Sequence, residues 1–143
     1  MLFEWANDAQ VRASSFSPAP ILWENHLFWF EKKLRDADCR ILIGLDENEN
    51  PIGQVRFDKT ARGEAEIDVS IDKGQRGGGI GGVFLEAATN EFFRVSDAEK
   101  IHAYVKTENV GSIKAFEKAN FQKLGTETVK GSETIHFVRT KND

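Results

Sequence analysis

The segment QRGGGIGG, residues 75–82, decides the fold, because five glycines stand between a strand pattern and an apolar helical pattern. Each glycine in the first turns of a helix costs about 1 kcal/mol relative to alanine, so this density requires a local cause. A tight turn with positive φ would need only one or two glycines. The other glycines are explained if backbone amides of this segment approach a phosphate closely, with the helix N-terminus and Arg76 supplying positive charge. The segment therefore predicts an anion-binding loop.

The surroundings of the loop argue against two common nucleotide-binding motifs. Gly77, Gly79 and Gly82 satisfy G-x-G-x-x-G, but that fingerprint follows the first buried parallel strand of a βαβ unit. Residues 66–72 before this loop instead alternate between polar and apolar, as in a half-buried strand that ends an antiparallel meander. A Walker A loop is excluded, because no Gly-Lys-Ser/Thr closes the segment.

Hydrophobic periodicity outward from the loop predicts a single domain over residues 1–143 with the order ααβββαβαββ. Helices are expected over residues 2–12, 23–34, 80–95 and 110–119, and strands over 40–45, 52–58, 66–72, 101–106, 124–129 and 133–139. In the second helix, an apolar stripe lies opposite the charged side: Trp23, Leu27, Phe30 and Leu34. The fold class is α/β in the α+β sense, a mixed and mostly antiparallel sheet with helices on both faces.

Composition excludes several functional classes. The 19 Lys and Arg residues against 23 Asp and Glu residues give a net charge of −4 without a basic cluster, which argues against non-specific binding of nucleic acid. No apolar run approaches the roughly 20 residues of a membrane span, and the first residues lack the pattern of a signal peptide. Cys39, the only cysteine, fits a reducing compartment. We expect a cytoplasmic protein with no metal, no membrane and no nucleic acid among its partners.

Two motifs in register resemble the GCN5-related N-acetyltransferase (GNAT) family. Arg76-x-x-Gly79-x-Gly81 is similar to the family's pyrophosphate loop, R/Q-x-x-G-x-G/A. A second stretch resembles the signature V-x-x-x-N-x-x-S/A-I-x-x-Y/F-x-x-x-G/N-F through Val105, Asn109, Ser112, Ile113, Phe116, Asn120 and Phe121. The resemblance covers residues 40–139. It implies acetyl-CoA as the cofactor and transfer of an acetyl group to an amine by direct attack.

The beginning of the chain resembles a narrower group within that family. Trp5-x-Asn7-x-x-x-Val11-Arg12 and Glu24-x-His26-x-x-Trp29-Phe30 are similar to bacterial acetyltransferases that act on amino-sugar nucleotides in pseudaminic-type sugar biosynthesis. This resemblance implies a nucleotide-linked amino sugar as acceptor. The substrate-binding candidates combine hydrogen-bonding and stacking groups: Asn7, Arg12, Phe16, His26 and Trp29. Acetylation of protein amines, and a degenerate acyl-CoA-binding module without catalysis, are the alternatives.

Two departures from the family pattern stand out. The family begins with a strand, whereas the helical pattern here starts at Leu2, so that strand is expected to be missing. The sheet edge this would expose favours a homodimer that covers it. Many members also place a tyrosine acid where this chain has Phe116, which cannot donate a proton. Tyr104, the only tyrosine, is the candidate replacement, and a structural role on its strand is the alternative.

The resemblance assigns the cofactor contacts and leaves the base open. The cofactor-binding candidates are Ile71, Arg76, Gly77, Gly78, Gly79, Ile80, Gly81, Asn109, Ser112 and Phe116, with the Ile71 amide as hydrogen-bond donor to the oxyanion. An attacking amine must be neutral, so a base is required, and the candidates are Glu66 and Asp68 on the polar face of their strand. Four of the candidate residues also have a purely structural explanation. Glu66 and Asp68 could simply form the solvated face of a strand, Asn109 could cap a helix, and Arg12 could be an ordinary surface charge.

Overall fold

The computed structural model describes residues 1–16, 19–72 and 79–142. Its six strands form one sheet in the order β1-β2-β3-β4-β6-β5. The strands are β1 (Cys39–Leu45), β2 (Pro51–Ala61), β3 (Glu64–Ile71), β4 (Lys100–Lys106), β5 (Gln122–Val129) and β6 (Ser132–Thr140). The helices are α1 (Leu2–Asn7), α2 (Ala9–Ser14), α3 (Trp23–Arg35), α4 (Ile80–Val95) and α5 (Val110–Lys118). Only the β3–β4 pair is parallel, so the predicted mixed, mostly antiparallel sheet is confirmed.

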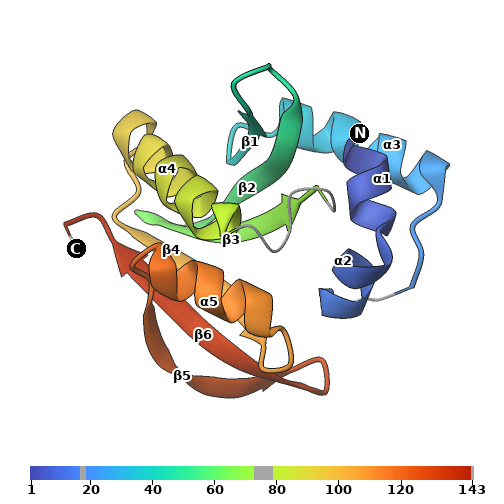
Figure 1. The fold of residues 1–143 in the computed structure, drawn as a ribbon. Coiled ribbons are helices and arrows are strands. Elements are labelled where there is room, and N and C mark those ends of the chain that lie inside the picture. Colours follow the sequence, from blue (N-terminus) through green and yellow to red (C-terminus); the bar gives the residue numbers. More distant parts are fainter. Residues whose placement is uncertain (17–18, 73–78, 143) are drawn as a thin grey trace.

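The hydrophobic core lies between the sheet and the helices α4 and α5, which cover one face (Figure 1). Alternate residues of β2 and β4 point into it, so that Val55, Phe57 and Ile101 are fully buried. The ring of Phe57 stacks on Phe92 of α4 with centroids 4.1 Å apart. Burial of a Phe or Ile side chain stabilises the fold by about 1.5–3 kcal/mol, so this layer fixes the positions of the strands.

The other face of the sheet is polar and packs partly against α3, which corrects the predicted orientation of that helix. Trp23 and Leu34 of the apolar stripe are 52% and 65% exposed. The side facing the sheet instead carries Lys33, whose Nζ donates to Asp58 Oδ1 of β2 at 2.7 Å. The opposing strand face bears charges, so the helix turns polar groups such as Lys33 toward it rather than the predicted apolar stripe.

The predicted first helix is two helices, because the chain turns at Asp8. Asp8 has the extended ψ of 137°. Its Oδ1 accepts a hydrogen bond from the Val11 amide at 3.3 Å, as an N-cap does. Next to this break, the side chain of Asn7 bonds both the amide and the carbonyl of Ile21, at 2.6 and 2.7 Å. These bonds tie α1 to the segment before α3.

The parallel strands β3 and β4 pair over only three residues and then part. The paired residues end at Glu66 opposite His102, whereas β3 continues to Ile71 and β4 continues to Lys106 alongside β6. The carboxyl-terminal half of β3 is therefore separated from β4, and an opening lies between them. Within the described ranges, no helix combines the length and apolarity that crossing a membrane requires.

Candidate active site

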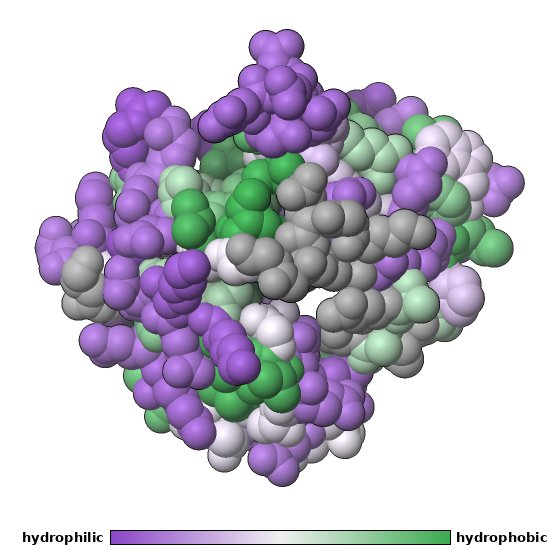
Figure 2. Space-filling model, viewed as in Figure 1, coloured by the Kyte–Doolittle hydropathy of each residue, from purple (hydrophilic) through white to green (hydrophobic). Residues whose placement is uncertain are grey.

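A cleft of about 880 Å³ occupies the opening between β3 and β4 and extends under α1, α2 and α3. On the face drawn in Figure 2, hydrophobic surface gathers near the centre and hydrophilic residues frame it. Most of the predicted site residues line the cleft: Arg12, Phe16, His26, Trp29, Asp68, Ile71, Gly79, Gly81, Tyr104, Asn109, Ser112 and Phe116. Asn7, Glu66 and Ile80 do not. Arg76, Gly77 and Gly78 lie outside the described residues.

One end of the cleft is formed by the N-termini of α4 and α5. Gly79 caps α4 with φ of +76°, a left-handed conformation that favours glycine. A Cβ on Gly82 would come within 2.6 Å of the Lys118 side chain, so only glycine lets the two helices approach this closely. Lys118 Nζ donates to the Gly79 carbonyl at 3.0 Å. A helix N-terminus beside a fixed ammonium group suits a phosphate.

Asn109 and Phe116 hold α5 in place at this end. Asn109 Oδ1 accepts a hydrogen bond from the Ser112 amide at 3.2 Å, so it is the N-cap of α5 while it also lines the cleft. Phe116 is buried, and its ring lies 5.0 Å from that of Phe121. Its position is therefore that of a core residue with one edge on the cleft.

Asp68 is the only carboxylate among the described residues that line the cleft. Its side chain is 56% exposed and lines the cleft. Burial among surrounding protein atoms raises the pKa of Asp68, and the nearby Arg56 guanidinium, 3.7 Å away, offsets only part of this rise. Burial and the charge of Asp58 likewise raise the pKa of Glu66, which does not line the cleft. Of the two candidates for the base, only Asp68 therefore lies in the cleft.

Tyr104 reaches the cleft from β4, and its ring stacks on His136 of β6 with centroids 4.5 Å apart. Burial raises the pKa of Tyr104, so its hydroxyl keeps its proton at neutral pH. Beside it, His102 Nδ1 lies 2.8 Å from His136 Nε2, and His102 Nε2 lies 2.7 Å from Glu64 Oε1. Tyr104 can therefore donate a proton. It lies next to the hydrogen-bonded side chains of Glu64, His102 and His136 on the polar face of the sheet.

The part of the cleft beside α2 and α3 carries aromatic rings and cations. His26 is buried, with its ring 5.6 Å from Trp29 and stacked on Phe30, and burial lowers its pKa. Lys106 Nζ donates to the Ala13 carbonyl at 3.1 Å and lies 5.8 Å from the centre of the Phe16 ring. The site therefore offers stacking surface beside positive charge.

Several lining residues escaped the sequence analysis: Asn25, Gln54, Arg56, Lys106, Lys114 and Lys118. The predicted hairpin places Arg56 on the polar face of its strand, but its pairing with Asp68 is known only from the observed register. Lys114 and Lys118 follow the helical spacing of i and i+4 on α5. Nothing in the sequence alone distinguishes these lysines from surface charges.

A parallel pair of strands that parts after three residues, with the glycine-capped N-terminus of a helix beside the opening, defines an acyl-CoA-dependent N-acyltransferase. The family model described as acetyltransferase (GNAT) domain matches residues 1–122. The chain therefore belongs to the GNAT acetyltransferase family, and it is an enzyme that uses acetyl-CoA. Among curated protein sequences, none matches the chain.

Solved structures of acetyltransferases share the fold. The spermidine N-acetyltransferase from Vibrio cholerae, in complex with CoA and spermine, has a TM-score of 0.86 at 17% identity, with 99% of this chain and 88% of that chain covered. The aminoglycoside acetyltransferase AAC(6')-Ib, in complex with ribostamycin and coenzyme A, has a TM-score of 0.81 at 23% identity, with 99% and 87% covered. At these identities the likeness establishes the fold.

The described residues fit acetyl-CoA. The left-handed Gly79, the close contact at Gly82 and the ammonium group of Lys118 would hold its phosphates, and the parted strands would receive the rest of the molecule. When bound, acetyl-CoA supplies the thioester carbonyl that an amine attacks.

Proposed function

We propose that the chain acetylates the primary amine of a small anionic molecule, specifically a nucleotide-linked amino sugar. The charge of the cleft carries this proposal. Its described lining contains one carboxylate, Asp68, against five cations: Arg12, Arg56, Lys106, Lys114 and Lys118. This excess stands in a chain of net charge −4. Charges of one sign inside a cleft focus the field and attract ligands of the opposite sign. The part of the cleft beside α2 and α3 would be the acceptor end, and its cations, beyond those that the CoA phosphates require, favour an anionic acceptor.

The arrangement of the acceptor end supports a ligand that has both a flat ring and phosphates. Trp29, His26 and Phe16 supply stacking surface, and Arg12, Arg56 and Lys106 supply positive charge near it. Spermine and ribostamycin, the amines bound by the structural neighbours, are polycations. This cleft, with one carboxylate in its described lining, would repel such amines.

We propose that Asp68 takes the proton from the acceptor amine, because it lies in the cleft and its raised pKa improves it as a base. The main-chain amide of Ile71 would donate to the oxyanion, as the family resemblance implies. Tyr104 would protonate the leaving thiolate in place of the tyrosine that Phe116 replaces. A thiol leaves readily as the anion, so this last contribution is expected to be modest.

A panel of amines tests the proposal through release of free thiol from acetyl-CoA at physiological salt. The panel contains a UDP-linked 4-amino sugar, the same amino sugar as its methyl glycoside, spermidine, kanamycin and a lysine peptide. We expect the highest kcat/KM for the UDP-linked amine. A higher kcat/KM for spermidine or kanamycin would contradict the anionic acceptor, and a preference for the peptide would favour protein amines. Binding of acetyl-CoA without thiol release for any amine would identify a degenerate binding module.

Three broader features remain proposals. Residues 1–143 would act as one catalytic domain in the cytoplasm, as the single cysteine suggests. A homodimer would cover β1, an edge strand of the sheet on which Leu45 is 54% exposed. Sedimentation equilibrium tests the dimer, and a purely monomeric protein at micromolar concentration would contradict it.

A further inference from the structure

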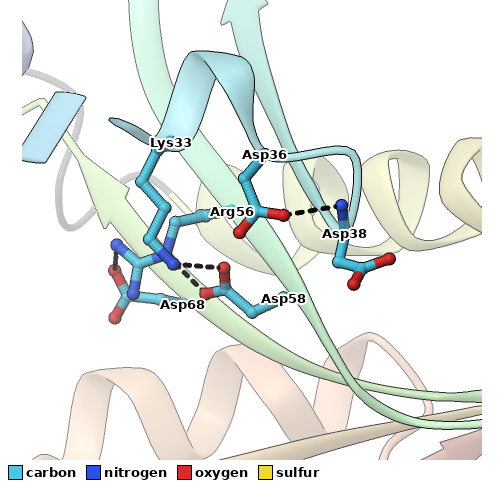
Figure 3. Close-up of polar contacts among 6 residues, drawn as sticks. All are labelled: Lys33, Asp36, Asp38, Arg56, Asp58 and Asp68. Atoms are coloured by element: carbon cyan, nitrogen blue, oxygen red, sulfur yellow. Dashed lines mark hydrogen bonds and ion pairs between the residues drawn. The ribbon is translucent and has the colours of Figure 1, made fainter. Parts of the chain in front are cut away.

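Arg56 stands at the centre of a row of charges that runs from α3 into the cleft (Figure 3). Lys33 Nζ donates to Asp58 Oδ1 at 2.7 Å, and Arg56 Nε donates to Asp58 Oδ2 at 2.8 Å. The Arg56 guanidinium carbon also lies 5.1 Å from the centre of the Trp29 ring. Its side chain is 23% exposed. One edge of the guanidinium group is thus bonded to Asp58, and one face is covered by an aromatic ring.

The opposite edge of the guanidinium group is turned toward the cleft. Its NH1 lies 3.7 Å from Asp68 Oδ2, which is an ion pair but too long for a hydrogen bond. Among the described residues, neither terminal nitrogen of Arg56 has a hydrogen-bond acceptor. Burial lowers the pKa of Arg56, but the charges of Asp68 and Asp58 outweigh this effect and raise it, so the group is always charged. The guanidinium group is therefore held in place and charged, and its two terminal nitrogens make no hydrogen bond within the part of the chain that the structure describes.

We propose that Arg56 is the residue that selects the acceptor, by binding an oxyanion of its diphosphate through the two terminal nitrogens. The inference rests on the proposed function, since the acceptor there is a nucleotide-linked amine. Two parallel N–H donors match two phosphate oxygens in a way that a lysine ammonium group cannot. Because Asp58 and Trp29 already hold the guanidinium group, little side-chain entropy is lost when the anion binds.

The position of Arg56 next to Asp68 couples recognition to chemistry. Without an acceptor, Arg56 is the counter-charge of Asp68. An oxyanion on the terminal nitrogens of Arg56 would share that counter-charge and add negative potential beside Asp68. Both effects increase the affinity of Asp68 for a proton. An acceptor that carries the anion would therefore improve the base that receives its amine proton.

Binding of UDP, measured by isothermal titration calorimetry in the presence of saturating CoA, tests the inference without relying on turnover. CoA fills its own phosphate site, so UDP reports on the acceptor end. We expect Arg56→Gln to weaken UDP binding roughly 10- to 100-fold, as loss of hydrogen bonds to a charged group does. Arg56→Lys should recover part of the loss. The matched control is Arg40→Gln, a strand arginine of β1 outside the cleft lining, which should leave the affinity unchanged.

Turnover separates a failure of this inference from a failure of the proposed function. With the UDP-linked amine, Arg56→Gln should raise KM more than it lowers kcat, and it should spare the methyl glycoside by comparison. Equal losses on both acceptors, or UDP binding that is unaffected by Arg56→Gln, would overturn the role of Arg56 while leaving the acetyltransferase in place. No acetylation of any nucleotide-linked amine by the unaltered protein would instead overturn the proposed function. If Arg56→Gln lowers the melting temperature strongly, Arg56→Lys provides the second test, because it keeps the positive charge without the two parallel donors and should still bind UDP more weakly than the unaltered protein.

Discussion

Replacement of Asp68 by asparagine is expected to lower kcat roughly 10²- to 10⁴-fold, the range that a positioned general base contributes. Asparagine has the same shape but cannot accept the amine proton. The upper part of the range applies here, because the described lining of the cleft holds no second carboxylate to take over. The assay is release of free thiol at saturating acetyl-CoA with the preferred amine, followed from pH 5.5 to 9. The acidic limb of the kcat/KM profile should disappear in the variant.

The same substitution should not cost stability. A carboxyl whose pKa is raised in the native state contributes stability that is complete below its unfolded value of 3.8 and is lost as the pH rises through the native pKa. Asparagine does not ionise, so at pH 7.5 it avoids that loss. We expect the melting temperature of Asp68→Asn to equal or exceed that of the unaltered protein. A clear fall would mean that the pair with Arg56 outweighs the cost of burial.

Glu66→Gln is the matched comparison, because Glu66 lies two residues away on the same strand face but outside the cleft lining. It should change kcat by no more than about threefold, as most surface substitutions do. A loss below tenfold for Asp68→Asn, or an equal loss for both variants, would refute the assignment of the base to Asp68.

Three further outcomes test the packing and the electrostatics of the fold. Gly53→Ala should destabilise the protein by about 1–3 kcal/mol in thermal unfolding, because its Cβ would lie 2.7 Å from the main-chain oxygen of Ser70; an unchanged melting temperature would contradict this register of β2 on β3. Trp5→Phe removes the hydrogen bond from Trp5 Nε1 to Asp72 Oδ1 at 2.9 Å, immediately before the glycine loop, and should raise KM for acetyl-CoA more than it lowers kcat; equal effects on both would point to a general loss of structure. Burial and the neighbouring His102 lower the pKa of His136. The contribution of the neutral imidazole to the stability of the fold is therefore complete above the ordinary pKa of 6.5 and is lost as the pH falls through the native pKa. The melting temperature of His136→Gln should depend less on pH between about 7.5 and 5.5 than that of the unaltered protein.

Local patterns in the sequence predicted most of the fold. The apolar period of 3.6 over residues 80–95 gave the observed bounds of α4, and the strict alternation from Glu66 to Ile71 placed β3. Both patterns depend only on which face of a helix or strand is buried, so they predict the element without knowledge of the segments that pack against it. The glycine-rich segment likewise predicts the site of the cofactor phosphates from a local pattern, and that assignment stays a prediction.

Features that depend on two distant segments could not be predicted. The side of α3 that faces the sheet is decided by Asp58 of β2, which attracts Lys33 and leaves Leu34 in solvent. The break at Asp8 similarly depends on the bonds between Asn7 and Ile21, which form only when α1 meets the segment before α3. The role of Arg56 follows from the register of β2 on β3, which an alternation pattern does not specify.

The choice between the two carboxylates follows from where the sheet opens. Strand alternation puts Glu66, Asp68 and Ser70 on the same face of β3, and by that criterion they are equivalent. They differ because β3 and β4 remain paired up to Glu66 opposite His102 and separate beyond that residue. Glu66 is therefore beside a continuous sheet, whereas Asp68 is the first acidic side chain past the point of separation and lines the cleft. A family signature places the strand and the loop, but the length of the β3–β4 pairing determines which residue on the strand can reach an amine.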